Sequence, residues 1–294
     1  MGFLNLFLFF FSSYMLMSMS FTLSQNLKCY PTQKFTTNST YDKNRKLILA
    51  SLASKVAVNG GFYNTTIGHE PNKVYGLAVC RGDSTPEICN ECVHLSVQQI
   101  LSDCPNQKEV IFWGQDPQCI VRYADHSIVG KLEMRPEVVG YTVDNVTSNL
   151  TGFHQLWEGV MDGLVTKASM GSSRLKFGTG EAVFTMFLKI FALMQCTPDI
   201  SQNDCNHCLR HIVLDFQTCC GQREGGYIYR PSCFFRWDFY PFYKVNITQS
   251  TGTKTNTTSN TTTNTTVRNS GGGGIATSIV VIIVVLIISG QFRC

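Results

Sequence analysis

The sequence contains few charged residues. Asp, Glu, Lys and Arg make up 15% of the 294 residues, whereas about a quarter is usual for a soluble protein. No charged residue precedes Lys28, and none lies between Arg268 and Arg293. The net charge is only +4, and no run of five or six basic residues occurs. The composition therefore gives no support for a nucleic-acid partner, and we expect none.

Motifs of the common enzyme classes are also missing. The chain has no Gly-rich phosphate loop and no Gly-x-Ser-x-Gly, and its carboxylates are scattered without a paired spacing. Its length leaves no room for a kinase of about 250 residues beside two ordinary domains. We therefore expect a non-enzymatic protein that needs no cofactor.

The two ends of the chain indicate the secretory pathway. Residues 3–19 are almost wholly apolar or small, and small residues follow at Ser20 and Ser24. This pattern predicts a signal peptide over residues 1–24, although a buried helix would show a similar run. Residues 250–274 are rich in Thr, Asn and Gly without apolar periodicity, which predicts a glycosylated stalk.

An apolar segment follows the stalk at residues 275–290. Counting the uncharged residues 271–290 gives twenty positions, which just reach the thickness of a bilayer core, about 30 Å. Two alternatives stay open: a short transmembrane helix, or a lipid-anchor signal with small residues at Asn269, Ser270 and Gly271. Both place the protein at the plasma membrane with its repeats outside the cell.

Glycosylation sequons and cysteines agree with that location. The chain has 13 cysteines, most of which should pair in an oxidising compartment. Eight Asn-x-Ser/Thr sequons predict N-glycosylation, at Asn38, Asn64, Asn145, Asn149, Asn246, Asn256, Asn260 and Asn264.

An internal repeat organises the middle of the chain. The spacing Cys-x8-Cys-x2-Cys occurs at Cys80 and again 116 residues later at Cys196. Cys104 recurs as Cys220 at the same offset, and Cys119 recurs as Cys233 at an offset of 114. These matches predict two copies of one domain, over residues 25–135 and 136–249.

Both copies show the same order of predicted elements. Each has a helix, a strand that leads into the cysteine motif, a second helix and a closing β-hairpin. The elements do not alternate, so we expect an α+β fold: two tandem copies of a small antiparallel sheet packed on two helices, rich in disulfides. The predicted helices are 41–58, 88–104, 153–169 and 204–219; the strands are 74–80 and 182–196; and the hairpins pair 109–113 with 118–123 and 227–230 with 233–239.

Two histidines accompany the second cysteine motif. His207 and His211 beside Cys205 and Cys208 would indicate zinc in a cytosolic chain. The first copy has Glu91 and Leu95 at the matching positions, and secreted thiols oxidise. We therefore expect solvated histidines on a helix and no metal site.

Aromatic residues gather near the end of the second copy, at Phe234, Phe235, Trp237, Phe239, Tyr240, Phe242 and Tyr243. One interpretation is that alternate members form the core and the others form the contact between the two domains. The other is an exposed aromatic strip for a glycan or a protein partner.

The doubled cysteine motif, with MQCTPDIS, DCNHCL and CCGQREGGYIYRPSCFFRW around its second occurrence, resembles the plant ginkbilobin-homologous, or stress-antifungal, domain. That family includes cysteine-rich repeat secretory proteins, plasmodesmata-located proteins and the ectodomains of cysteine-rich receptor-like kinases. The resemblance covers about residues 29–243. It implies a small antiparallel sheet on two helices, and the disulfides Cys80–Cys89, Cys92–Cys119, Cys29–Cys104, Cys196–Cys205 and Cys208–Cys233.

The second copy departs from this pairing. The position that would hold the partner of Cys220 is Asn145, and the adjacent Cys219 has no counterpart in the first copy. Cys219 and Cys220 can form a vicinal disulfide, pair with another chain, or stay free. We favour the vicinal disulfide, because these two are left over in an ectodomain set of twelve.

The resemblance also implies a mannose site, whose polar residues are mostly replaced. Its three positions are Tyr30, Trp113 and Ala124 in the first copy, and Tyr227 and Asp238 are the two that can be assigned in the second. Only Asp238 keeps the required chemistry, so it is a weak candidate for carbohydrate binding. Because a sugar needs several convergent donors and acceptors, we expect little mannose binding.

These observations lead to a membrane-tethered recognition or scaffolding module at the plant cell surface, acting in stress or defence. Its expected partners are cell-surface proteins, including receptor-like kinases of the same family, and a cell-wall or fungal glycan is a further candidate. Two alternatives are a secreted-type mannose-binding lectin with antifungal action and a plasmodesmata-located structural protein.

Overall fold

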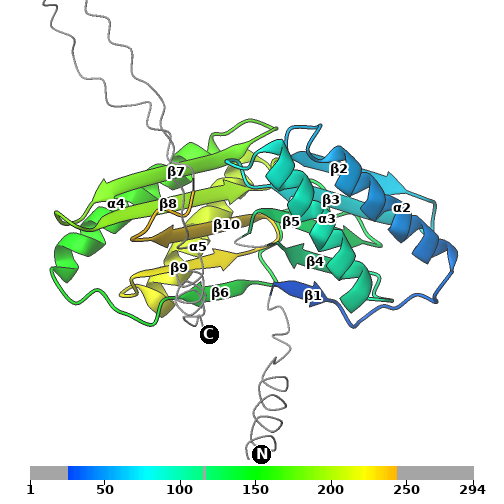
Figure 1. Ribbon diagram of the computed structural model, residues 1–294, viewed down its shortest axis with the longest axis horizontal. Helices are drawn as coiled ribbons and strands as arrows, with labels where there is room; N and C mark the ends of the chain where they lie inside the picture. Colours follow the sequence, from blue (N-terminus) through cyan, green and yellow to red (C-terminus); the bar gives the residue numbers. More distant parts are fainter. Residues whose placement is uncertain (1–25, 115–116, 244–294) are drawn as a thin grey trace, which may run out of the picture.

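The computed structural model describes residues 26–114 and 117–243. They form two repeats, each with a five-stranded antiparallel sheet and two helices (Figure 1). The predicted signal peptide, stalk and apolar segment lie outside the described residues. So do four of the predicted glycosylation sites, Asn246, Asn256, Asn260 and Asn264.

The first repeat places its strands in the order β1-β4-β5-β3-β2. The central strand β5 therefore lies between the strand that precedes the cysteine motif and the first strand of the closing hairpin. In chain order the elements are β1 (Leu27–Cys29), α2 (Thr40–Lys55), β2 (Phe62–Ile67), β3 (Val74–Cys80), α3 (Pro86–Asp103), β4 (Val110–Trp113) and β5 (Cys119–Ala124).

The second repeat has the same topology, with the strand order β6-β9-β10-β8-β7. The α+β class, the two copies and the two helices per sheet are therefore confirmed. In chain order the elements are β6 (Val138–Tyr141), α4 (Leu150–Ser169), β7 (Lys176–Val183), β8 (Lys189–Cys196), α5 (Gln202–Cys220), β9 (Gly225–Tyr229) and β10 (Cys233–Asp238).

Polar side chains fix where the helices begin. Ser39 caps α2 by accepting a hydrogen bond from the Asp42 amide at 3.3 Å. Ser201 caps α5 in the same way, with the Asp204 amide at 3.0 Å. Such caps satisfy amides that have no partner within the helix. In α3 the cap is Thr85, followed by a proline at the first helical position, where its missing N–H does no harm.

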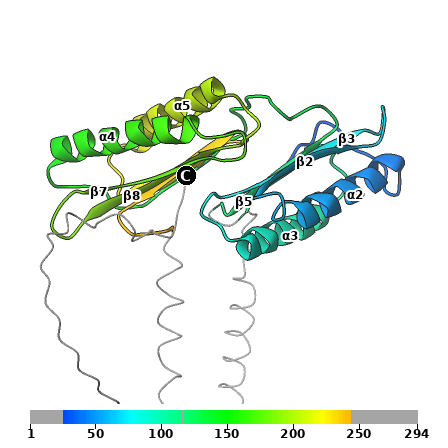
Figure 2. The ribbon, with the colours of Figure 1, turned by 90° about the horizontal axis from the view of Figure 1, so that it is seen from above.

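The sheets have one face toward their own helices and the other toward the opposite repeat. Figure 2 shows α4 and α5 above their sheet and α2 and α3 below theirs. Along β10, Phe235 and Trp237 belong to the helix-side core, whereas Phe234 belongs to a third cluster shared by both repeats. This alternation confirms the first interpretation of the aromatic segment.

The contact between the repeats combines apolar packing with buried hydrogen bonds. Trp113 is 1% exposed, and its Nε1–H donates to the Arg230 carbonyl at 3.2 Å. The Gln195 amide is fully buried; its oxygen accepts from the Gly82 amide and its nitrogen donates to the Cys80 carbonyl, each at 2.9 Å. These satisfied polar groups set one relative placement of the two sheets.

One predicted strand is wrong, and four strands were not predicted. The predicted strand 182–196 is two elements: β7 ends at Val183 and β8 begins at Lys189, with a hairpin loop between them. Strands β1, β2, β6 and most of β7 were not predicted. All four are the edge strands of their sheets, so their apolar patterns are weak.

Candidate functional site

Five of the six disulfides tie a helix to its sheet. The short bridges Cys80–Cys89 and Cys196–Cys205 join a strand end to a helix start, with Cα atoms 5.5 and 5.8 Å apart. The other pairs are Cys29–Cys104, Cys92–Cys119, Cys208–Cys233 and Cys219–Cys220. The first five are the pairs that the family resemblance implies. The last joins neighbouring residues at the end of α5, as the vicinal alternative requires.

The positions of the implied mannose site in the first repeat lie between the two repeats. Trp113 and Ala124 are buried members of the shared cluster, and Tyr30 packs against it. Burial, followed by the nearby Glu109 carboxylate, raises the pKa of the Tyr30 hydroxyl to about 12. Contact with the second repeat thus covers the surface where a sugar would have to dock.

In the second repeat Asp238 is 4% exposed. Burial raises the pKa of its carboxyl to about 6, against the opposing effect of Arg236 and of hydrogen bonds from residues 239 and 240. The Phe239 amide donates to it at 2.9 Å, and a Cβ on Gly225 would approach it to 3.0 Å. Tyr227, the other assigned position in this repeat, stacks on Tyr229 at 4.3 Å between ring centroids. A sugar could reach Asp238 only by displacing these contacts.

An open groove runs along the outer side of α3 in the first repeat. Its volume is about 690 Å³. The floor includes Phe112 and the Cys92 side of a disulfide, and the helix contributes Glu91, Leu95 and Gln99 to the wall. The groove mixes apolar carbon with amides and carboxylates and has no buried charge at its base.

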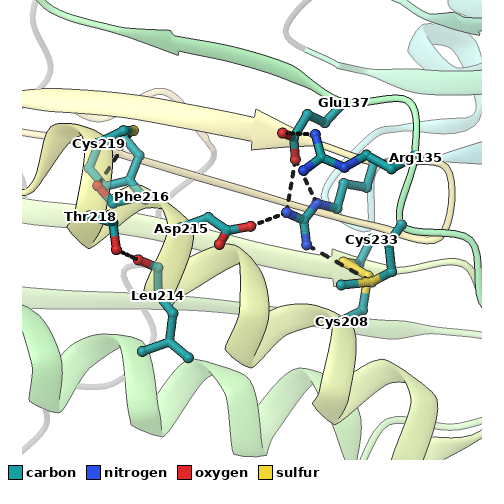
Figure 3. Close-up of polar contacts among 11 residues, drawn as sticks. Arg135, Glu137, Cys208, Leu214, Asp215, Phe216, Thr218, Cys219 and Cys233 are labelled. Carbon is teal, nitrogen blue, oxygen red and sulfur yellow. Dashed lines mark hydrogen bonds and ion pairs between the residues drawn. A yellow bond between two sulfur atoms is a disulfide. The ribbon is translucent and has the colours of Figure 1, made fainter.

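In the second repeat an arginine fills the corresponding place. Arg230 occupies the position of Gly114, and Asp215 occupies the position of Gln99, both at the offset of 116. The Arg230 guanidinium is buried and bonds to Glu137 at 2.8 Å and to Asp215. Figure 3 shows Asp215 and Glu137 reaching the same group from two sides. The groove is therefore a feature of the first repeat.

Within residues 26–114 and 117–243, the most exposed large apolar side chains lie at the tip of the β7–β8 hairpin. Met186 is 90% and Phe187 is 89% exposed. The matching loop between β2 and β3, residues 68–73, is GHEPNK and carries no large apolar side chain. The sequence does not reveal this tip, because the apolar residues of 182–196 predict one continuous strand.

Backbone hydrogen bonds, a side-chain hydrogen bond and a ring contact stabilise the hairpin beneath this tip. The Phe184 and Thr185 amides donate to the Leu188 carbonyl at 2.9 and 3.0 Å. The Thr185 hydroxyl accepts from the Phe187 amide at 3.2 Å, and Phe184 stacks on Phe239 with ring centroids 6.0 Å apart. A loop tied in this way presents Met186 and Phe187 without collapsing onto the sheet, which lowers the entropy cost of a contact.

Other site types are not found among residues 26–114 and 117–243. No group of three or more His, Cys, Asp or Glu side chains in this part could hold a metal ion. No helix in it is long and apolar enough to cross a membrane, and the predicted span at 275–290 is not among the residues searched.

Comparison with known proteins identifies the domain. The family described as "Salt stress response/antifungal" matches residues 28–126 and 141–240. The chain belongs to this family. Each match covers one repeat of the structure, so the stress-antifungal domain is present twice.

Relatives within the family are receptor-like kinases. Cysteine-rich receptor-like protein kinase 14 of Arabidopsis thaliana is 42% identical over 217 residues, 73% of this chain and 33% of the kinase. Kinase 11 of the same plant is 43% identical over 215 residues, 71% of this chain and 32% of the kinase. The chain thus spans about a third of the length of these kinases.

A solved structure shares the fold. The tandem DUF26 ectodomain of the Arabidopsis thaliana cysteine-rich receptor-like protein PDLP8 superposes with a TM-score of 0.63 at 23% identity, covering 73% of this chain and 97% of that one. The paired stress-antifungal domains therefore have the fold of a receptor-like ectodomain.

Proposed function

We propose that this protein is a non-enzymatic recognition module, tethered to the membrane on the outside of the cell, that binds a protein partner through the β7–β8 tip. The observation that carries the proposal is the exposure of Met186 and Phe187 on a braced hairpin. An extracellular location is supported by the six disulfides, which persist in oxidising compartments, and by the similarity to a receptor-like ectodomain.

The tip has the properties of an interface anchor. Full burial of a Met or Phe side chain contributes about 1.5–3 kcal/mol, so the two together offer about 3–6 kcal/mol before the cost of association. Large exposed apolar groups on a monomer mark interaction sites. A polar surface loop would not need them, as the β2–β3 loop shows.

A protein fits this surface better than a glycan. A sugar site needs convergent hydrogen-bonding groups, and the side chains of Val183, Met186, Phe187 and Leu188 offer none. The expected partner is a protein with an apolar pocket, and ectodomains of receptor-like kinases of the same family are the first candidates.

The experiment measures binding of the full chain to the purified ectodomains of kinases 14 and 11. M186S/F187S should weaken binding at least about tenfold, because one lost anchor of this size is worth more than about 1.4 kcal/mol. The control H69S alters the exposed polar hairpin of the first repeat and should bind like the unaltered chain. No binding to either ectodomain, or equal binding by M186S/F187S, would overturn the proposal.

Tethering and sugar binding are tested separately. Release of the protein from cells by phospholipase C indicates the lipid anchor, and retention indicates the helix; release of full-length protein without detergent or enzyme contradicts tethering.

On a glycan array we expect no mannose signal. A mannose signal that is lost in D238N would instead support the lectin alternative.

A further inference from the structure

Two histidines form a close pair on the exposed side of α5. His207 and His211 are four residues apart, and their ring centroids are 4.3 Å apart with the ring planes tilted by 53°. Both side chains are exposed. Within the described residues neither imidazole has a hydrogen bond or an ion pair. Both rings are therefore free to use a nitrogen lone pair toward a ligand from solvent.

The groups around this pair are committed elsewhere. Cys205 and Cys208 are held in disulfides. Arg210 lies between the histidines in sequence, but its Nε–H donates to Asn206 at 3.1 Å and its other end reaches Asp162 at 3.4 Å. The nearest cation is thus directed toward α4 and away from the imidazoles.

The helix that carries the pair is fixed in place. The disulfides of Cys205 and Cys208 attach α5 to β8 and β10, and Cys208 lies between the two histidines. Asp204 and Asp215 lie one turn before and one turn after the pair on the same face. Asp215 is paired with the buried Arg230, so the Asp204 carboxylate supplies the negative charge that favours a bound cation.

We propose that His207 and His211 chelate a divalent transition-metal ion through one nitrogen of each ring, with water in the remaining positions. Histidines at i and i+4 on one helix face are the spacing with which proteins hold zinc in the His-Glu-x-x-His motif. Imidazole suits Cu²⁺, Ni²⁺ and Zn²⁺, and the affinity of such a site is highest for Cu²⁺. This proposal departs from the sequence-based expectation of solvated histidines and no metal site, which weighed a site shared with cysteines; the site proposed here uses no cysteine.

The first repeat provides the comparison. The positions that match His207 and His211 are Glu91 and Leu95, which line the α3 groove. They keep the same helical spacing on a helix that is also held by disulfides, but they supply no imidazole. A two-histidine site therefore belongs to the second repeat alone.

The experiment titrates the full chain with CuCl₂ at pH 7.5, where histidines are mainly neutral, after alkylation of Cys294. Calorimetry should show one equivalent bound at this site, and electron paramagnetic resonance should show two equatorial nitrogens. H207N and H211N should each lower the affinity at least about tenfold, or about 1.4 kcal/mol, because a single imidazole then remains to hold the ion. H154N is the matched control on α4 and should leave the site unchanged.

A second test introduces the two histidines into the first repeat, so that the expected result is a gain of metal binding. E91H/L95H builds the same spacing on α3 and should add a second equivalent of bound Cu²⁺. Because the exchanged residues are exposed or line an open groove, circular dichroism should confirm unchanged folding in every variant. Equal stoichiometry and affinity in the unaltered chain and in H207N/H211N, or signals with a single nitrogen, would overturn the proposal.

Discussion

The hairpin of the first repeat ends in Gly68, His69, Glu70, Pro71 and Asn72, whereas the hairpin of the second ends in Phe184, Thr185, Met186, Phe187 and Leu188. The strands that these loops join pair in the same way. The outer faces of the second helices differ as well, with a groove along α3 and a filled position beside α5. The two copies thus share one fold and differ both at exposed positions, such as the hairpin tips, and at a buried one, where Arg230 stands in place of Gly114.

The repeats also differ in how their first strand is attached to the rest of the domain. In the first repeat Cys29 on β1 is bonded to Cys104 at the end of α3, across 75 residues. In the second repeat Cys220 is bonded to its neighbour Cys219. There β6 is held by its backbone pairing with β9, and the segment that follows it is held by the hydrogen bond from the Val146 amide to the Gln222 carbonyl at 2.8 Å. The comparison teaches that similar topology can be stabilised by a covalent link in one copy and by hydrogen bonds in the other.

The largest loss of stability should come from removing the disulfide that joins β1 to the end of α3. C29A/C104A should lower the free energy of unfolding by about 4 kcal/mol, because a 75-residue loop is no longer closed in the unfolded chain. C219A/C220A should cost less than about a quarter of that, since a bond between neighbours closes almost no loop. Guanidinium titration of both variants measures the difference, and similar losses would contradict this account.

The second effect concerns Asp238, whose counterpart in the first repeat is Ala124. The folded-state pKa is raised from 3.8 to about 6, so the folded state favours the neutral carboxyl. Its contribution is complete below about pH 4 and is lost as pH rises through about 6, by roughly 2–3 kcal/mol. Unfolding of the unaltered chain and of D238N should be compared at pH 4 and pH 7. A stability difference that stays constant between these pH values would refute the assignment.

The third effect measures how much the buried Arg230, which stands in the second repeat where the first has its groove, contributes to stability. R230A should lower the free energy of unfolding by about 2 kcal/mol, because Glu137 and Asp215 lose a buried partner but can still reach water. The control R210A removes a pair whose side chains are 53% and 72% exposed and should cost less than about 1 kcal/mol. Thermal unfolding orders the two variants. Equal costs would show that burial of Arg230 contributes nothing to the difference between the repeats.

The smallest effect concerns the predicted glycosylation sites Asn145 and Asn149, which are exposed, as are Asn38 and Asn64. Asn149 also caps α4, where its side chain accepts from the Gly152 amide at 3.3 Å and its φ is 47°. When both proteins are compared after deglycosylation, N149Q should cost about 1 kcal/mol and N145Q close to nothing. Mass spectrometry should show one glycan fewer in each variant. Full glycan occupancy in N149Q, or equal stabilities, would contradict these roles.

The class of fold could be predicted because its signals are local. Apolar spacing along α3 and α5 and the flanking cysteines lie within about twenty residues of each other, and a strand such as β10 shows its two faces through alternation. The edge strands β1 and β6 could not be predicted, since three or four residues carry too little pattern. The hairpin at 184–188 was missed because its apolar residues continue those of the strands beside it.

By itself the sequence determined the two repeats, their antiparallel α+β class and the pattern of cysteines, because these follow from spacing along the chain. Only the tertiary structure decided what covers the second face of each sheet. Trp113 and the Arg230 carbonyl meet across 117 residues, and no local pattern specifies that contact. The same holds for Arg230 between Glu137 and Asp215. Each depends on side chains whose directions are set by packing between elements that are distant in the sequence.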